Sequence, residues 1–184
     1  AEGAGSLLIF THTFADRAGA ASFAAGWQTC LDDMAAVLAG DIVDEAAAVG
    51  PEWRQQMAKL HEEYIDWLAL NAGTVEATAT GWQVRFERQL TQPIDAVWAK
   101  LTAGSTPVVG ATPPPGFTVE GIVAGAINGV EAPNWVDYAW LLDGRAAGSV
   151  RWELTFGTGH GARLIVTQQG SAETAHQQGR VLAA

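Results

Sequence analysis

The chain contains two copies of one strand-forming segment. The opening residues Gly5-Ser-Leu-Leu-Ile-Phe-Thr-His12 align without gaps on Gly161-Ala-Arg-Leu-Ile-Val-Thr-Gln168, with identical glycine, leucine, isoleucine and threonine. Both copies lead through a short polar turn into an alanine-rich stretch. A repeat at the spacing of a whole domain indicates tandem domains. We therefore predict that residues 1–40 are the last strand and helix of a preceding repeat, residues 41–79 a linker helix region, and residues 80–184 a second domain lacking most of its last helix.

Apolar periodicity predicts a strand and two helices in the N-terminal part. Leu7 to Phe14 is dense in apolar and β-branched residues, as expected of a strand. From Ala18 to Ala39, bulky apolar side chains recur every three or four residues and form one stripe on a helix that Gly40 ends. Pro51 fits the first turn of a second helix, which extends to Leu70. The single cysteine, Cys30, lies among the apolar residues of the first helix, and we expect it to be buried.

The remaining chain is predicted to be mostly strands. Apolar and polar residues alternate from Trp82 to Leu90, which is typical of a half-buried strand, and a short helix follows from Thr91. Proline and glycine make Ala103 to Gly116 a loop. Hairpin turns then favour an antiparallel meander with strands at about Phe117–Val130, Trp135–Leu142, Ser149–Phe156 and Arg163–Gln169.

Composition excludes several classes of protein. Eight tryptophans and only 16% charged residues exclude a disordered chain, and 184 residues can bury a full core. A formal net charge of -10 would repel phosphate backbones and anionic membranes, so we expect neither nucleic acid nor a membrane as a partner. One cysteine and four scattered histidines offer no zinc site, and we expect no metal and no cofactor. Without a long apolar run or a signal segment, we expect a cytoplasmic location.

Several motifs resemble those of a known family. The segments Trp82–Leu90 and Pro93–Thr102 are similar to the opening strand and helix of the activator of heat-shock protein 90 ATPase homologue-like family. This family belongs to the SRPBCC superfamily, whose START-like and birch-pollen-allergen-like members have helix-grip folds. Gly129–Pro133, Ser149–Thr155 and Gly161–Thr167 resemble its later motifs. The proline-rich loop departs from the family, because members often carry a Trp-Phe segment at that place.

The resemblance implies an α+β helix-grip fold, in which a curved antiparallel sheet wraps around a long helix and leaves a pocket between them. The strand periodicity agrees, because it places the large aromatic residues of two neighbouring strands on one face. The candidate cavity residues are therefore Phe23, Trp27 and Leu31 from the first helix, Tyr138, Trp140, Trp152 and Leu154 from the sheet, and His12 from the opening strand. For His12 we favour a hydrogen-bonded core or sheet-edge histidine over a cavity role, since the repeat places Gln168 at the matching position.

No catalytic motif is present in the sequence. His61 is followed by two glutamates but lacks the second histidine of an HExxH zinc site, so we interpret it as solvated surface. The leading hypothesis is a non-enzymatic domain that binds a small hydrophobic ligand or a protein partner. The alternative is a cyclase- or hydrolase-like enzyme, which needs His12, Tyr138 or Glu153 to face inward. The family name alone suggests a third, a chaperone-associated stress-response module.

The repeat also predicts how the N-terminal helix packs. Residues 172–184 are too short for a full gripping helix, so the sheet needs another cover for its aromatic face. The N-terminal strand and helix have the equivalent shape. We expect them to dock on the sheet, either within one chain as a permuted helix-grip fold or between two chains as a swapped homodimer.

Overall fold

The computed structural model describes residues 6–43, 50–118, 122–159 and 161–177. In chain order, its elements are α1 (Ala20–Ala39), α2 (Pro51–Trp67), β1 (Thr74–Thr78), β2 (Gly81–Gln89), α3 (Ile94–Thr102), the short 3-10 helix η2 (Pro115–Phe117), β3 (Val123–Glu131), β4 (Trp135–Leu142), β5 (Arg145–Phe156), β6 (Ala162–Ser171) and the 3-10 helix η3 (Ala172–Gln177). The rest of the predicted C-terminal helix, residues 178–184, lies outside the described residues.

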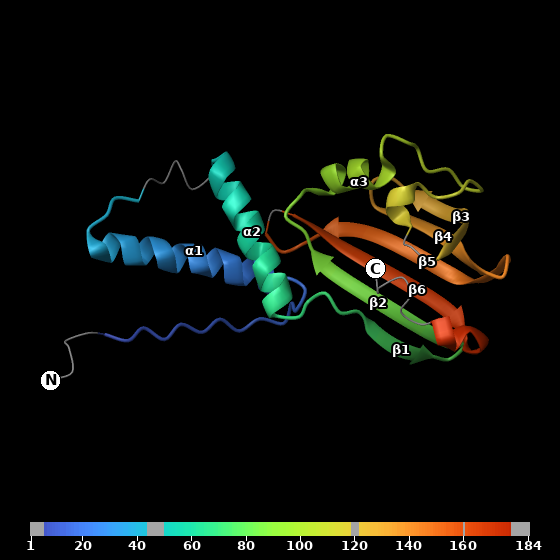
Figure 1. The fold of residues 1–184 in the computed structure, drawn as a ribbon, viewed down its shortest axis with the longest axis horizontal. Helices are drawn as coiled ribbons and strands as arrows, with labels where there is room; N and C mark the ends of the chain where they lie inside the picture. The colour runs from blue at the N-terminus through green and yellow to red at the C-terminus, as the bar shows by residue number, and fades with distance from the viewer. Residues whose placement is uncertain (1–5, 44–49, 119–121, 160, 178–184) are drawn as a thin grey trace.

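The strands form one curved antiparallel sheet in the order β1-β2-β6-β5-β4-β3 (Figure 1). The α+β class and the helix-grip type of sheet are therefore as predicted. β2 and β6 pair along their whole length, which places the first and last strands of the predicted second domain side by side. Asp143 and Gly144 both have positive φ, as a two-residue hairpin turn between β4 and β5 requires. The strand β1 was not predicted, because all of its residues are exposed and give no alternation.

One face of this sheet, which we call the inner face, carries the hydrophobic core. The core residues are at most 3% exposed, and they are Trp82, Val84, Phe117, Ile127, Val136, Tyr138, Trp140, Val150 and Val166. Trp98 and Leu101 of α3 pack against this cluster, so α3 and the proline-rich segment cover part of the inner face. Two polar groups in the core are satisfied, because Tyr138 Oη donates to the Phe117 carbonyl at 2.7 Å and Trp140 Nε1 donates to the Gln169 carbonyl at 2.8 Å.

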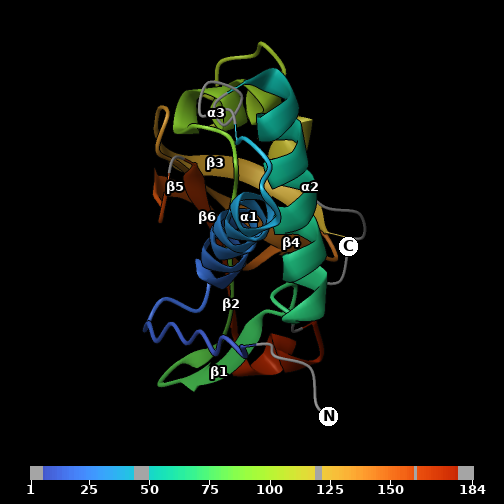
Figure 2. The same ribbon diagram turned by 90° about the vertical axis from the view of Figure 1, so that its left-hand side faces the viewer.

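The two N-terminal helices form a hairpin beside the sheet. Ala21 of α1 packs with Ile65 and Leu70, which belong to α2 and the segment after it. Figure 1 shows α1 projecting away from the ends of the strands, and Figure 2 shows α1 nearly end-on with α2 alongside it. The predicted helices are thus confirmed, and α1 ends at Gly40, whose φ of 93° glycine adopts without strain.

Three expectations for the N-terminal part are wrong. Leu7 to Phe14 does not form a strand. The repeat matches this segment to β6, and β6 itself already lies between β2 and β5. Helix α1 packs on α2 and does not cover the inner face, so the permuted arrangement within one chain does not form. Cys30 is exposed rather than buried, because α2 contacts only one side of α1.

Candidate functional site

The structure divides the candidate cavity residues into two separate groups. The first group lies on the N-terminal segment and α1. His12 accepts a hydrogen bond from Trp27 Nε1 at its Nδ1 atom, at 3.0 Å, and its ring stands edge-on to Phe23 with centroids 5.0 Å apart. Phe10 and Phe14 stack on Trp27 and Phe23, respectively. His12 therefore belongs to an exposed aromatic cluster and is not in a cavity with sheet residues.

The second group belongs to the core of the sheet. Tyr138, Trp140 and Leu154 are at most 3% exposed, and Trp152 packs edge-on against Phe117. Burial raises the pKa of the Tyr138 hydroxyl to about 12, so it remains protonated and donates to the Phe117 carbonyl. These residues thus lie on the inner face, apart from the aromatic cluster around His12.

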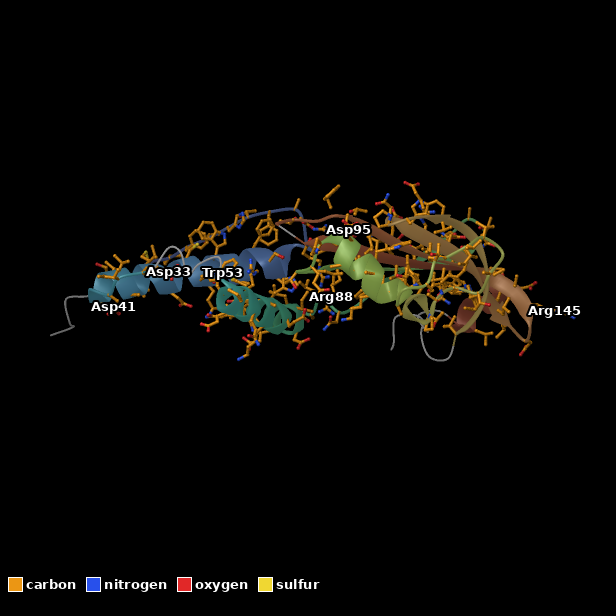
Figure 3. All side chains as sticks on the ribbon, turned by 90° about the horizontal axis from the view of Figure 1, so that it is seen from above. Asp33, Asp41, Trp53, Arg88, Asp95 and Arg145 are labelled. Atoms are coloured by element: carbon orange, nitrogen blue, oxygen red, sulfur yellow. The ribbon has the colours of Figure 1, made fainter. Side chains whose placement is uncertain are left out.

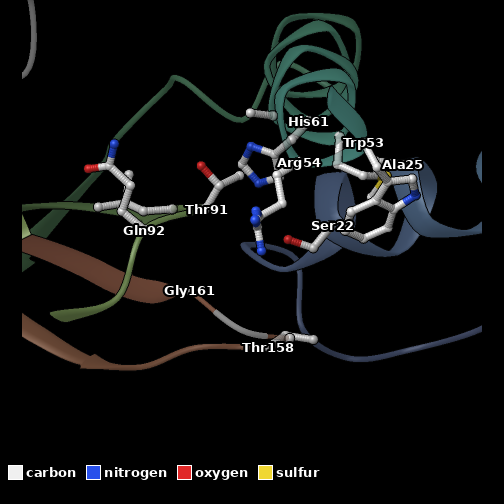
Figure 4. Close-up of a pocket in the computed structure, with 13 residues that line it drawn as sticks. Ser22, Ala25, Trp53, Arg54, His61, Thr91, Gln92, Thr158 and Gly161 are labelled. Carbon is white, nitrogen blue, oxygen red and sulfur yellow. The ribbon is translucent and has the colours of Figure 1, made fainter. Parts of the chain in front are cut away.

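A pocket of about 640 Å³ lies elsewhere, between the helical hairpin and the ends of the strands (Figure 4). Four segments enclose it: α1, α2, the residues after β2, and the connection between β5 and β6. Its apolar lining comes from Ala25, Trp53, Met57, Ala58 and Leu90. Its polar lining comes from Ser22, Arg54, His61, Thr91, Gln92 and Thr158.

His61 is the most unusual residue of this pocket. It is only 2% exposed, and neither ring nitrogen has a hydrogen-bond partner. The nearest carboxylate oxygen, Glu62 Oε1, is 3.6 Å from Nδ1, which is too long for a hydrogen bond. Burial lowers the pKa of His61 below its ordinary value of 6.5, so the ring is neutral at pH 7. The interpretation of His61 as solvated surface is therefore wrong.

The burial of His61 follows from its place on α2. Met57, His61 and Ile65 are spaced by four residues and so share one face of the helix, and this face turns toward α1 and the sheet. This spacing is the sequence signal that could have found the histidine. It was missed because His61 was judged by the two glutamates that follow it in the sequence.

Two residues in the first turn of α2 add hydrogen-bond donors. The indole Nε1 of Trp53 is buried and has no partner. Arg54 is exposed and forms no ion pair with any described residue. Figure 4 shows Arg54, Ser22 and His61 extending toward the same space. The side chains on this side of the pocket are thus mainly donors.

A polar network fixes the start of α1 to the sheet. Asp16 accepts two hydrogen bonds from the Arg163 guanidinium, at 2.7 and 2.5 Å, and others from the Thr158 hydroxyl and the Gly19 amide. Arg163 also donates to Glu87 at 3.0 Å. The hydrogen bonds from Arg163 lower the pKa of Asp16 to about 2, so this carboxylate is charged at neutral pH.

A second link joins α2 to the sheet. Arg88 on the inner face of β2 pairs with Glu62 of α2, and Figure 3 shows Arg88 at the junction between the hairpin and the sheet. On the outer face, Arg163 of β6 pairs with Glu87 of β2, whereas Arg85 and Arg151 pair with glutamates of their own strands. These links fix the pocket walls to one another.

Comparisons with known proteins give structural matches only. No family profile and no curated protein matches the chain. CalU16 from Micromonospora echinospora is 18% identical, with a TM-score of 0.42 over 56% of this chain and 71% of that one. Protein MLL2253 from Mesorhizobium loti is 23% identical, with a TM-score of 0.41 over 52% and 81%. DynU16, encoded in the dynemicin biosynthetic locus, is 20% identical, with a TM-score of 0.40 over 52% and 40%. Matches at this level say nothing about activity.

Two further properties concern the described residues. None of their helices is long and apolar enough to cross a membrane. Within the same residues, no three or more histidine, cysteine, aspartate or glutamate side chains are grouped as metal ligands would be.

The Asp16 network should contribute pH-dependent stability. Because its pKa is lowered in the folded state, Asp16 stabilises the fold above about pH 4, and this contribution disappears as the pH falls through about 2. Asp16→Asn should lower the free energy of unfolding by about 1 kcal/mol at pH 7, after allowance for partial exposure. Urea denaturation of the variant and of Asp32→Asn, an exposed control on α1, would measure this. A difference from wild type that persists undiminished at pH 2 would contradict the assignment.

His61 should make the fold sensitive to mild acid. The unfolded chain binds a proton at His61 more readily than the folded chain, so the free energy of unfolding should fall as the pH drops below 6.5. His61→Leu removes both unpartnered nitrogens, and it should remove this decline and leave stability at pH 5.5 equal to or above that of wild type. Thermal melts between pH 5 and 7 measure the effect, with His12→Leu as the control that keeps it. A marked loss of stability in His61→Leu at all pH values would show that the ring is structurally required.

Proposed function

We propose that the chain is a non-enzymatic helix-grip domain that binds a small, largely apolar ligand in the pocket between the helical hairpin and the sheet. The observation that carries this proposal is the pocket of about 640 Å³ into which the buried, unpartnered His61 is built. Small-molecule sites have volumes of roughly 300–1,000 Å³ and combine apolar walls with a few polar groups. An unpaired buried polar group destabilises a protein, and a ligand that supplies its missing partner removes that cost.

The enzyme alternative has less support. It required an inward-facing polar residue, and His12 lies in the exposed aromatic cluster while Glu153 pairs with Arg151 on the outer face. Tyr138 faces inward, but its hydroxyl is held by the Phe117 carbonyl and its raised pKa disfavours proton transfer at neutral pH. Apart from Tyr138, the described residues of the core cluster carry no acidic or basic group.

Membership of the heat-shock protein 90 ATPase activator homologue-like family is part of the proposal. It is supported by the motifs in β2 and α3 and by the pairing of β2 with β6. A chaperone-associated role and a cytoplasmic location would follow from that membership. The original cavity on the inner face is retained as the competing binding site, with Trp152 its most accessible candidate residue.

An environment-sensitive neutral dye should locate the ligand site. Nile red should bind and shift its emission, and Ala58→Phe, which fills the pocket, should weaken binding about tenfold. Ala35→Phe, at an exposed position of α1, is the matched control and should leave binding unchanged. Fluorescence titration measures both. Dye binding that is lost in Trp152→Ala but kept in Ala58→Phe would place the ligand on the inner face of the sheet instead.

Exposed apolar residues favour a second candidate function, self-association as a swapped homodimer. Leu7, Ile9, Leu38 and Ile42 on the N-terminal segment and α1 are 79% to 96% exposed. Phe156, on the inner face of the sheet, is 92% exposed and offers a contact for α1 of a second chain. Groups of large apolar side chains exposed together on a surface often mark an interaction site.

Light scattering after size-exclusion chromatography would test this dimer. The wild-type chain should elute with the mass of two chains, and Leu38→Glu should shift it toward one chain because it places a charge in the contact. Val108→Glu introduces the same charge at an exposed valine of the loop after α3 and should not change the mass. A wild-type monomer at the highest soluble concentration would rule out the swapped dimer.

A further inference from the structure

The polar side of the pocket offers donors to a ligand. Trp53 Nε1 is a donor only, its hydrogen is buried, and it has no acceptor. The guanidinium of Arg54 contributes up to five donors and no acceptor. Neutral His61 contributes one N–H, and its second nitrogen is equally unpartnered. A ligand that satisfies this side must therefore be rich in acceptors.

The distribution of charged residues also favours a ligand that is rich in acceptors. The chain has 20 acidic and 10 basic residues, yet no aspartate or glutamate is among the described residues that line the pocket. Arg85, Arg88, Arg151 and Arg163 each pair with a carboxylate of the chain. Arg54 differs from these four, because within the described structure it has a polar pocket in front of it and no carboxylate partner. The described lining of the pocket thus carries one unpaired positive charge and no carboxylate.

The position of Arg54 on α2 adds to this local potential. Trp53 and Arg54 lie in the first turn of a 17-residue helix, where the helix dipole favours an anion. Glu52 shares that turn but does not line the pocket. The opposite walls are apolar, with Ala25, Met57 and Leu90 available to an aliphatic chain.

We propose that the ligand of this pocket is an amphipathic monoanion, an aliphatic carboxylate whose head group is held by Arg54 and His61 and whose chain packs on the apolar walls. This inference rests on the proposed ligand-binding function and names the chemical class of the ligand. The carboxylate supplies the acceptors that the buried donors lack, and its charge meets the one arginine among the described pocket residues.

Three probes with the same alkyl chain separate head-group recognition from apolar binding. Decanoate, decanol and decylammonium are titrated into the purified chain by calorimetry, below the concentrations at which they aggregate. Decanoate should bind about tenfold to a hundredfold more tightly than decanol, as expected for charge-assisted hydrogen bonds, and decylammonium should bind most weakly. Equal binding of decanoate and decanol, or tighter binding of decylammonium, would overturn the inference while leaving an apolar ligand site in place. Failure of all three together with Nile red would overturn the proposed function as well.

Variants then assign the selectivity to this pocket. Arg54→Gln should remove most of the preference for decanoate over decanol and keep decanol binding, because Arg54 is exposed and its loss leaves the apolar walls intact. Lys59→Gln removes the same charge from an exposed position of α2 outside the pocket lining and should keep the preference. His61→Leu should weaken decanoate without weakening decanol. Equal losses of preference in Arg54→Gln and Lys59→Gln would show a general effect of charge and overturn the site; a preference unchanged in Arg54→Gln would do the same.

Discussion

The ion pair between Asp16 and Arg163 determines how the two parts of this protein meet. Asp16 precedes α1, whereas Arg163 lies on β6 in the middle of the sheet, and their bidentate contact joins residues far apart in sequence. The same carboxylate holds the Thr158 hydroxyl in the β5–β6 connection. Because the pocket lies between the hairpin and this connection, its shape depends on the carboxylate remaining charged. The lowered pKa of Asp16 keeps this carboxylate charged down to about pH 2.

The packing of the sheet explains why the pocket lies at that junction. Tyr138, Trp140 and Trp82 are large, and together with Phe117 they are almost completely buried on the inner face. The Tyr138 hydroxyl and the Trp140 indole donate to backbone carbonyls, and the Trp82 indole donates to the Thr174 hydroxyl, so these side chains are held in place. The space available to a ligand lies where two separately packed units meet, and there His61 and Trp53 have no polar partners.

Similar sequence patterns gave correct and incorrect predictions, depending on which elements of the fold lie next to the segment. The alternation in β2, β4 and β5 predicted the strands well, because each has a buried face and a polar face. Leu7 to Phe14 has an equally strand-like composition, but it has no neighbour to complete its backbone hydrogen bonds, since β6 occupies the equivalent place. His61 was judged by the acidic residues beside it, although its helical neighbours four residues away decide its surroundings.

The sequence by itself determined the positions of most helices and strands and the hairpin turn at Asp143 and Gly144, because these depend on side-chain spacing and backbone preferences within one segment. Its resemblance to a known family implied the class of the fold. Only the tertiary structure decided that α1 pairs with α2 instead of covering the sheet, that Tyr138 and Trp140 are buried in the core, and that His61 is buried without a partner. These outcomes depend on which surfaces compete for the same contact. That competition involves residues distant in sequence, such as Asp16 and Arg163, so its result cannot be predicted from any single segment.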